Sequence, residues 1–250
     1  MRQNSAELIT NQLFDRLFPS IEKGENLLGE FEIFGIIRDA KKIPEKDESL
    51  SVQGLAWLVL GEVEKGSELC EEAIEINPTE SAIWINYAVA LGQRGHYSRQ
   101  RSVLNRSAFT LSPSLMLFDF IISSFWADYR EMNRVKEIFK SLDGIELSEK
   151  QKEDYKMAEV IYDTLDSLSE AEQTSLAEMA NLAMEILTRH KLKTKNSAQY
   201  VAPDGMLSFN YDVFEATANS IVKLNDELAS EIVEHGLYNA KSIVLFTPGV

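Results

Sequence analysis

The spacing of proline constrains the fold of this chain more than any other feature. The sequence has only six prolines, and Pro44, Pro78 and Pro113 are separated by 34 and 35 residues. Proline cannot continue a helix, and it pushes the preceding residue out of the helical region. A nearly constant interval of this length is typical of repeats that are built from paired helices. The spacing therefore predicts a stack of helical hairpins.

The residues between these prolines have the helical period. Apolar side chains recur at steps of three and four residues in two successive units, residues 47–80 and 81–113. Gly61 and Gly95 lie where each unit needs a tight turn between its helices. The predicted helices are Leu50–Leu60 and Val63–Ile76 in the first unit, and Trp84–Leu91 and His96–Leu111 in the second.

Small and aromatic residues recur at matching places in the two units. They are Gly54, Trp57, Gly61, Ala73 and Pro78 in the first, and Trp84, Asn86, Ala88, Leu91, Gly95, Tyr97, Ala108 and Pro113 in the second. This pattern resembles the tetratricopeptide repeat, with departures at Gly66 and Gln100, where that family prefers alanine. The resemblance implies a superhelix of helical hairpins and a role in protein recognition.

Weaker helical patterns extend the array on both sides. The last two predicted helices each open with a capping box, Ser148 with Gln151 and Ser169 with Glu172. We therefore expect one helical-repeat domain over residues 1–190. Outside the two units, its predicted helices are Ser5–Phe18, Asn26–Ile43, Leu115–Tyr129, Asn133–Leu142, Ser148–Leu168 and Ser169–His190.

The character of the sequence changes after residue 190. Residues 191–197 are polar and basic, which indicates a linker or loop. Residues 198–250 then predict a small β-β-α-β module that packs on the helices, with a turn at Pro203–Gly205. The expected fold is mainly α: an α-α superhelix with a small C-terminal α+β module. Because a short sheet has edges that can pair, we also expect homo-oligomers through this module.

Charge is unevenly distributed along the chain. The formal net charge is −15, which argues against nucleic acid as a partner. Residues 43–80 carry ten acidic and two basic side chains, and residues 143–185 carry twelve and three. Residues 86–142, between them, carry four acidic and eight basic side chains. Blocks of one sign can select a protein partner.

Motifs that carry chemistry are absent from the sequence. There is no phosphate-binding glycine loop, nucleophile elbow or zinc-protease motif, and the three histidines lie far apart. The single cysteine, Cys70, excludes an intrachain disulfide and suits a reducing compartment. No apolar run has the length that a membrane span needs. We therefore expect a cytoplasmic protein without catalytic activity, cofactor, metal or membrane contact.

Two hypotheses for partner binding follow. In the first, an adaptor or chaperone-like module receives a protein segment on the concave face of its first helices, at Asn86, Tyr87 and Ala90 and beside Arg94. In the second, an acidic inhibitor, such as an immunity protein or antitoxin, blocks a basic toxin or nuclease. The acidic side chains proposed for contact are Glu62, Glu68 and Glu72. An enzyme with a site between the helices and the C-terminal module is a third class, without a supporting motif.

Overall fold

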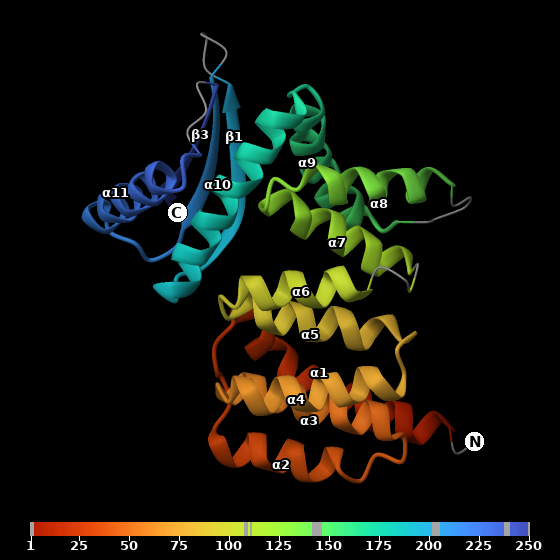
Figure 1. Ribbon diagram of the computed structural model, residues 1–250. Coiled ribbons are helices and arrows are strands. Elements are labelled where there is room, and N and C mark those ends of the chain that lie inside the picture. Colours follow the sequence, from red (N-terminus) through yellow and green to blue (C-terminus); the bar gives the residue numbers. More distant parts are fainter. Residues whose placement is uncertain are drawn as a thin grey trace. The chain divides into compact units, whose positions relative to one another are not determined.

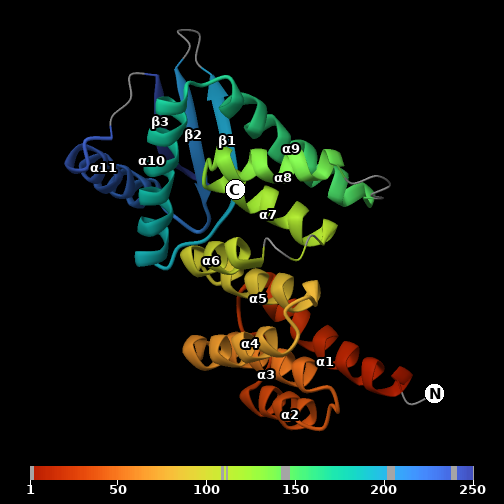
Figure 2. The ribbon, with the colours of Figure 1, turned by 45° about the vertical axis from the view of Figure 1, so that its right-hand side comes forward.

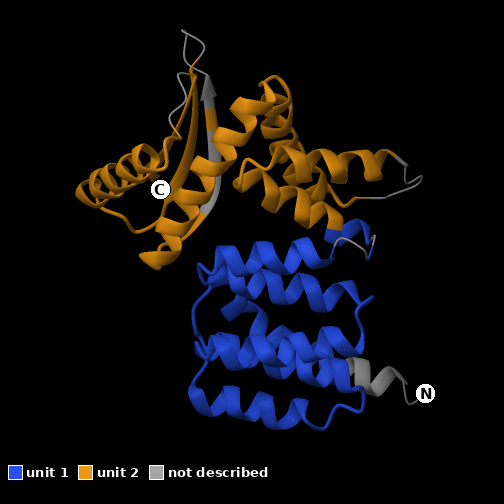
Figure 3. Cartoon of the chain, viewed as in Figure 1, with its two compact units in different colours: residues 1–115 blue, residues 116–250 orange. Residues whose placement is uncertain are grey.

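The computed structural model describes residues 3–107, 110, 112–141, 147–201, 206–237 and 241–249. The chain divides into two compact units, residues 1–115 and 116–250 (Figure 3). This division falls earlier than the domain boundary that the sequence predicts at residue 190. The reason is that the helix before residue 190 packs against the C-terminal sheet, so both belong to one core.

Unit 1 is a stack of helices, as the proline spacing predicts (Figure 1). The two hairpins between the prolines are α3 with α4 and α5 with α6, and α2 packs on α3 at one end of the stack. Together with the helices of unit 2 they confirm a mainly α fold. The helices of unit 1 are α1 (Gln3–Lys23), α2 (Glu30–Ala40), α3 (Lys46–Leu60), α4 (Val63–Ile76), α5 (Ser81–Gln93) and α6 (Tyr97–Ser107).

Glycine lets α3 and α4 approach closely. A Cβ atom on Gly54 would lie 2.5 Å from Cys70 Sγ and 2.8 Å from the Gly66 carbonyl oxygen, so no larger side chain fits there. Gly61 follows α3 with φ 95°, a left-handed conformation that ends the helix. The turn predicted at Gly61 is therefore confirmed.

Gly66 and Gln100 stand where the tetratricopeptide family prefers alanine, and in each case the residue opposite has a compensating size. In the first hairpin, a Cβ on Gly66 would lie 2.7 Å from Leu58 Cγ. In the second hairpin, a Cβ on Gly92 would lie 2.2 Å from Gln100 Nε2. The large side chain is therefore on the first helix in one hairpin and on the second helix in the other. Close packing is kept because each large residue faces a glycine.

Helix α1 does not form the predicted hairpin with α2. It contacts α3 and α5, the first helices of both hairpins, more extensively than it contacts α2 (Figures 1 and 2). Its buried side chains Leu13, Leu17 and Ile21 recur at four-residue steps, which places them on one face of the helix. Thr10 Oγ1 also donates a hydrogen bond to Glu48 Oε2 on α3 at 2.6 Å. The N-terminal helix thus packs on the first-helix side of the stack.

Unit 2 combines helices with a three-stranded sheet of order β1-β2-β3. Strand β1 is antiparallel to β2, and β2 is parallel to β3. Helices α10 and α11 contact β3 and each other, and the strand residues Phe209, Tyr211 and Phe246 are buried. The elements are α7 (Pro113–Phe125), α8 (Tyr129–Ser141), α9 (Glu149–Asp166), α10 (Glu170–Arg189), β1 (Thr194–Val201), β2 (Leu207–Val213), α11 (Ala218–Glu234) and β3 (Ser242–Pro248).

Several boundaries in unit 2 differ from the prediction. Strand β1 begins at Thr194, so the predicted loop at 191–197 is wrong from that residue on. An edge strand tolerates lysine and other polar residues, which explains the misleading composition. Tyr129 begins α8 instead of ending α7, because Ala127 has φ 47° and Asp128 accepts a hydrogen bond from the Glu131 amide. The predicted turn at Pro203–Gly205 lies outside the described residues.

The outer edge of β3 is partly satisfied within the unit. Asn225 of α11 pairs with the backbone of Phe246, accepting from its N–H at 2.8 Å and donating to its carbonyl oxygen at 3.0 Å. Pro248, two residues on, has no N–H to offer. These contacts weaken the argument for strand pairing along β3. Oligomerisation through the C-terminal module therefore stays a prediction.

Candidate functional site

The first-helix face, where the sequence predicts a binding groove, is largely buried. Tyr87 is 3% exposed and Ala90 is 2% exposed, while Asn86 is half-buried. Helix α1 contacts both first helices. Trp57 of the first helix α3 packs edge-on against Phe34 at a ring-centroid distance of 5.8 Å. Of these four residues, Tyr87 lines the groove described below, and partner binding by Asn86, Ala90 and Trp57 stays a prediction.

Arg94, predicted beside the binding groove, makes a hydrogen bond within unit 1. It lies at the end of α5, and its Nη2 donates a hydrogen bond to the Val59 carbonyl oxygen of α3. Burial lowers the pKa of the Arg94 guanidinium. The side chain therefore links the ends of the two first helices.

An open groove lies on the other side of the stack, between the second helices α4 and α6. Its volume is about 520 Å³. Residues of α4 and α6 form its walls, and Tyr87 of α5 also lines it. The lining residues are Glu64, Ser67, Glu68, Glu71, Tyr87, Arg99, Ser102, Val103 and Arg106.

Two ion pairs join α4 to α6 along this groove. Arg99 forms two hydrogen bonds with Glu64, at 2.6 and 3.0 Å, and Arg106 forms two with Glu71, at 2.6 and 2.9 Å. The hydrogen bond from Arg99 lowers the pKa of Glu64, and the bonds to Glu64 and Glu71 raise the pKa values of the two arginines. Both pairs span 35 residues, close to the proline interval. The arginines of the basic segment thus neutralise part of the preceding acidic block.

Tyr87 brings a hydroxyl group to this groove. Its ring is buried, and burial raises its pKa to about 12, so the hydroxyl keeps its proton at neutral pH. Ser67 and Glu71 of α4 line the same groove. The hydroxyl therefore lies beside α4 in the groove.

The three acidic residues predicted for partner contact have different surroundings. Glu72 is half-buried and pairs with Lys46 at 2.9 Å, and Glu62 is exposed at the start of α4. Glu68 is exposed and lines the groove, and within the described ranges no side chain forms an ion pair with it. The groove thus unites Tyr87 and Glu68 from the sequence-based set. Arg99 and Arg106 were not predicted as groove residues, although they lie 35 residues after Glu64 and Glu71, close to the proline interval.

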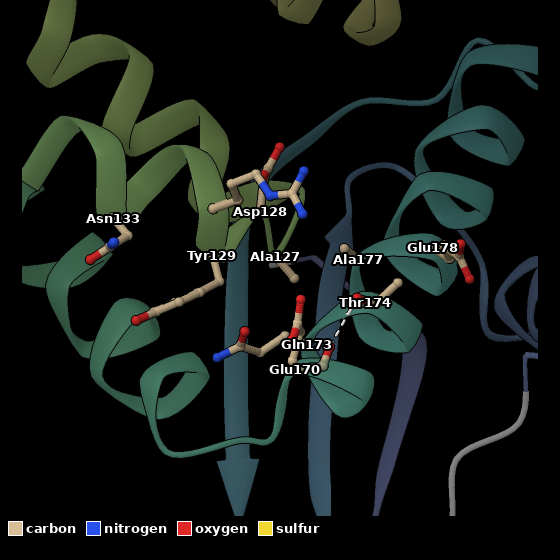
Figure 4. A pocket seen from close by; sticks show the side chains of 10 residues that line it. Ala127, Asp128, Tyr129, Asn133, Glu170, Gln173, Thr174, Ala177 and Glu178 are labelled. Atoms are coloured by element: carbon tan, nitrogen blue, oxygen red, sulfur yellow. Dashed lines mark hydrogen bonds between the residues drawn. The ribbon is translucent and has the colours of Figure 1, made fainter.

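A second hollow, of about 570 Å³, lies within unit 2 (Figure 4). It is lined by the turn from α7 to α8 and by the first half of α10, including Tyr129, Asn133 and Gln173. Gln173 Nε2 donates to the Leu165 carbonyl oxygen at 2.8 Å, and Asn133 Oδ1 accepts from the Tyr162 hydroxyl at 2.8 Å. Several of its polar groups therefore already hold the unit together.

Other titratable groups also have structural surroundings. Cys70 is fully buried, and burial raises the pKa of its thiol. His190 and His235 lie at the C-terminal ends of α10 and α11, and His190 Nε2 lies 2.8 Å from Glu227 Oε2. In the part of the chain that the structure describes, no three His, Cys, Asp or Glu side chains are grouped as a metal site would need. No helix there is long and apolar enough to cross a membrane.

Comparison with known proteins supports the repeat in one segment. Residues 69–101 match a model of the tetratricopeptide repeat. No curated protein and no solved structure matches the chain. The matched segment runs from α4 to α6 and includes Glu71, Tyr87 and Arg99 of the groove. The chain therefore contains a tetratricopeptide-like repeat in the region that forms the groove.

Proposed function

We propose that the protein is a non-catalytic protein-binding module that holds a basic partner segment in the groove between α4 and α6. The observation that carries this proposal is Glu68, an exposed carboxylate without an ion pair in the described residues, beside the Tyr87 hydroxyl. Tetratricopeptide-like repeats suggest protein partners, and the matched segment overlaps this groove.

The charges of the groove favour a basic side chain on the partner. Arg99 and Arg106 already bind Glu64 and Glu71 with two hydrogen bonds each, so their positive charges are offset within the chain. Glu68 leaves one negative charge in the same groove. A lysine or arginine that reaches Glu68 gains a charge-assisted hydrogen bond, the stronger class of polar contact.

The first-helix face supports this function less well. Ala90 is buried there, and α1 of the same chain contacts both first helices. A partner segment would have to displace α1, whereas the α4–α6 groove is open. An adaptor role remains part of the proposal, with the binding surface moved to the second helices.

The acidic-inhibitor hypothesis loses much of its support. Glu64, Glu71 and Glu72 of the first acidic block pair with Arg99, Arg106 and Lys46. In the second block, Glu172 pairs with Lys241. The net charge of a segment therefore overstates the charge that it can offer to a basic toxin, and we do not propose this function.

Charge reversal in the groove tests the proposal. Glu68→Lys should abolish capture of a partner that the unmodified protein retains in a quantitative pull-down from native lysate. Glu153→Lys is the matched control, because Glu153 is also an exposed helical glutamate and the change in net charge is equal. The proposal predicts a partner shared by the unmodified and Glu153→Lys proteins and lost with Glu68→Lys. Equal capture by all three proteins would overturn it.

A further inference from the structure

The outer face of α2 exposes large apolar side chains at the end of the helical stack. Phe31 is 93% exposed, Phe34 is 45% exposed, and Leu27, just before the helix, is 49% exposed. The opposite face of α2 holds the buried residues Ile33, Ile36, Ile37 and Ala40. The helix therefore carries large apolar side chains on both faces, although only one face packs on the stack (Figure 1). A group of exposed large apolar side chains with charged residues around it is typical of an interaction surface.

A glycine, Gly35, lies in the middle of this face, with open space where a side chain would be. Gly35 lies between Phe31 and Arg38 on the outer side, since residues three and four apart share a face. A Cβ atom there would meet nothing within 4 Å. Glycine destabilises the middle of a helix relative to alanine, so it serves a purpose where another backbone approaches closely. Unit 1 shows that use at Gly54 and Gly66, where α3 and α4 cross.

The two ends of α2 carry opposite charges, so the helix is complementary in charge to an antiparallel copy of itself. Glu30 lies at its N-terminal end, and Lys41 follows its C-terminal end. Both are exposed, and among the described residues neither has an ion-pair partner. They are eleven residues apart, which is close to three helical turns, so they lie along the same side of the helix. An antiparallel copy of α2 would place each Glu30 near the Lys41 of its partner.

We propose that the outer face of α2 binds the same face of a second copy of this chain, with the two helices antiparallel. Phe31 and Phe34 form the apolar centre of this contact, and Gly35 allows the two helices to approach closely. Two symmetry-related Glu30–Lys41 ion pairs close its ends. The arrangement has twofold symmetry, the commonest symmetry of soluble oligomers. It uses a surface different from the α4–α6 groove, so both can be occupied together.

The length of α2 limits the area of the contact and therefore the expected affinity of the dimer. Eleven residues span about 16 Å of helix. Such a contact is smaller than the roughly 1,200–2,000 Å² that stable interfaces bury. The dimer should therefore exchange with monomer as concentration changes.

Sedimentation of the full chain across a wide concentration range tests the dimer. The mass should rise from 28.3 kDa toward twice that value. Phe31→Glu should weaken association about tenfold or more and leave the fold intact, because the ring is 93% exposed. Val222→Glu is the control, since Val222 is a 58% exposed apolar residue on α11. A monomer at every concentration, or a dimer that survives Phe31→Glu, would overturn the proposal.

Charge exchange distinguishes this pairing from other contacts. Glu30→Lys and Lys41→Glu should each weaken the dimer, because each places like charges opposite one another. The double variant Glu30→Lys/Lys41→Glu should restore it, because both symmetric pairs form again with their signs exchanged. Circular dichroism of each variant checks that α2 stays folded. Failure of the double variant to recover association would contradict antiparallel pairing.

Discussion

The two faces of the hairpin stack in unit 1 differ in what covers them. The first-helix face, made by α3 and α5, is contacted by α1, and Ala90 of α5 is almost fully buried. The second-helix face, between α4 and α6, is an open groove joined by two arginine–glutamate pairs. The same two hairpins therefore present one face to their own chain and one face to solvent.

This difference shows why a repeat pattern does not by itself locate a binding surface. The pattern fixes which residues face the neighbouring helix, because the helical period and the proline interval act locally. Whether a face stays open depends on segments outside the repeat. Here α1, which carries no repeat signature, packs against one face and leaves the other free.

The largest expected effect is a difference in the free energy of unfolding between a variant on the first-helix face and a variant on the second-helix face. Ala90→Glu places a charge at a position that is 2% exposed, so it should lower the free energy of unfolding by about 3 kcal/mol or more. Ser102→Glu, at an exposed position on α6, should change it by less than about 0.5 kcal/mol. Urea unfolding followed by circular dichroism measures both. Similar stabilities for the two variants would mean that the first-helix face is not buried.

A second effect concerns the packing of α1. Leu17 is fully buried on α1, so Leu17→Ala should cost about 2–5 kcal/mol of unfolding free energy. Faster amide exchange should follow in α3 and α5, which α1 contacts. Phe18→Ala, at the neighbouring residue that is 44% exposed, is the control and should have a smaller effect on both. If exchange in α3 and α5 does not respond to Leu17→Ala, α1 does not protect that face.

The smallest effect is expected at the ion pairs of the groove. Arg106→Ala removes a pair whose two side chains are 48% and 34% exposed, so the free energy of unfolding should fall by less than about 1 kcal/mol. Arg106→Lys keeps the charge without the paired hydrogen bonds and should give an intermediate value. Thermal unfolding at low and high salt measures the difference. A loss of several kcal/mol would mean that this groove is part of the core of unit 1.

Much of unit 1 could be predicted because its signals are local. Helix α4 has the bounds that the apolar period predicts, and Gly61 turns the chain as expected. In unit 2 the capping serines Ser148 and Ser169 begin α9 and α10 as predicted. Each of these features depends on residues that are close in sequence, so composition and spacing reveal it.

The features that were missed depend on distant residues. The contacts of α1 with α3 and α5 have no local signature, and neither has the polar edge strand that begins at Thr194. The groove could have been predicted in part. Its ion pairs join residues 35 apart, close to the proline interval, but the net charge of a segment does not show which of its charges are paired.

Site-specific photo-crosslinking tests most directly whether a partner uses the α4–α6 groove. A photoreactive phenylalanine would replace Ser102 in the groove or, in a second protein, Asn86, which shares a face of α5 with Ala90. With the partner recovered by pull-down, crosslinks are predicted from position 102 and not from position 86. Crosslinks from position 86 alone would contradict the account and would return the binding surface to the first helices.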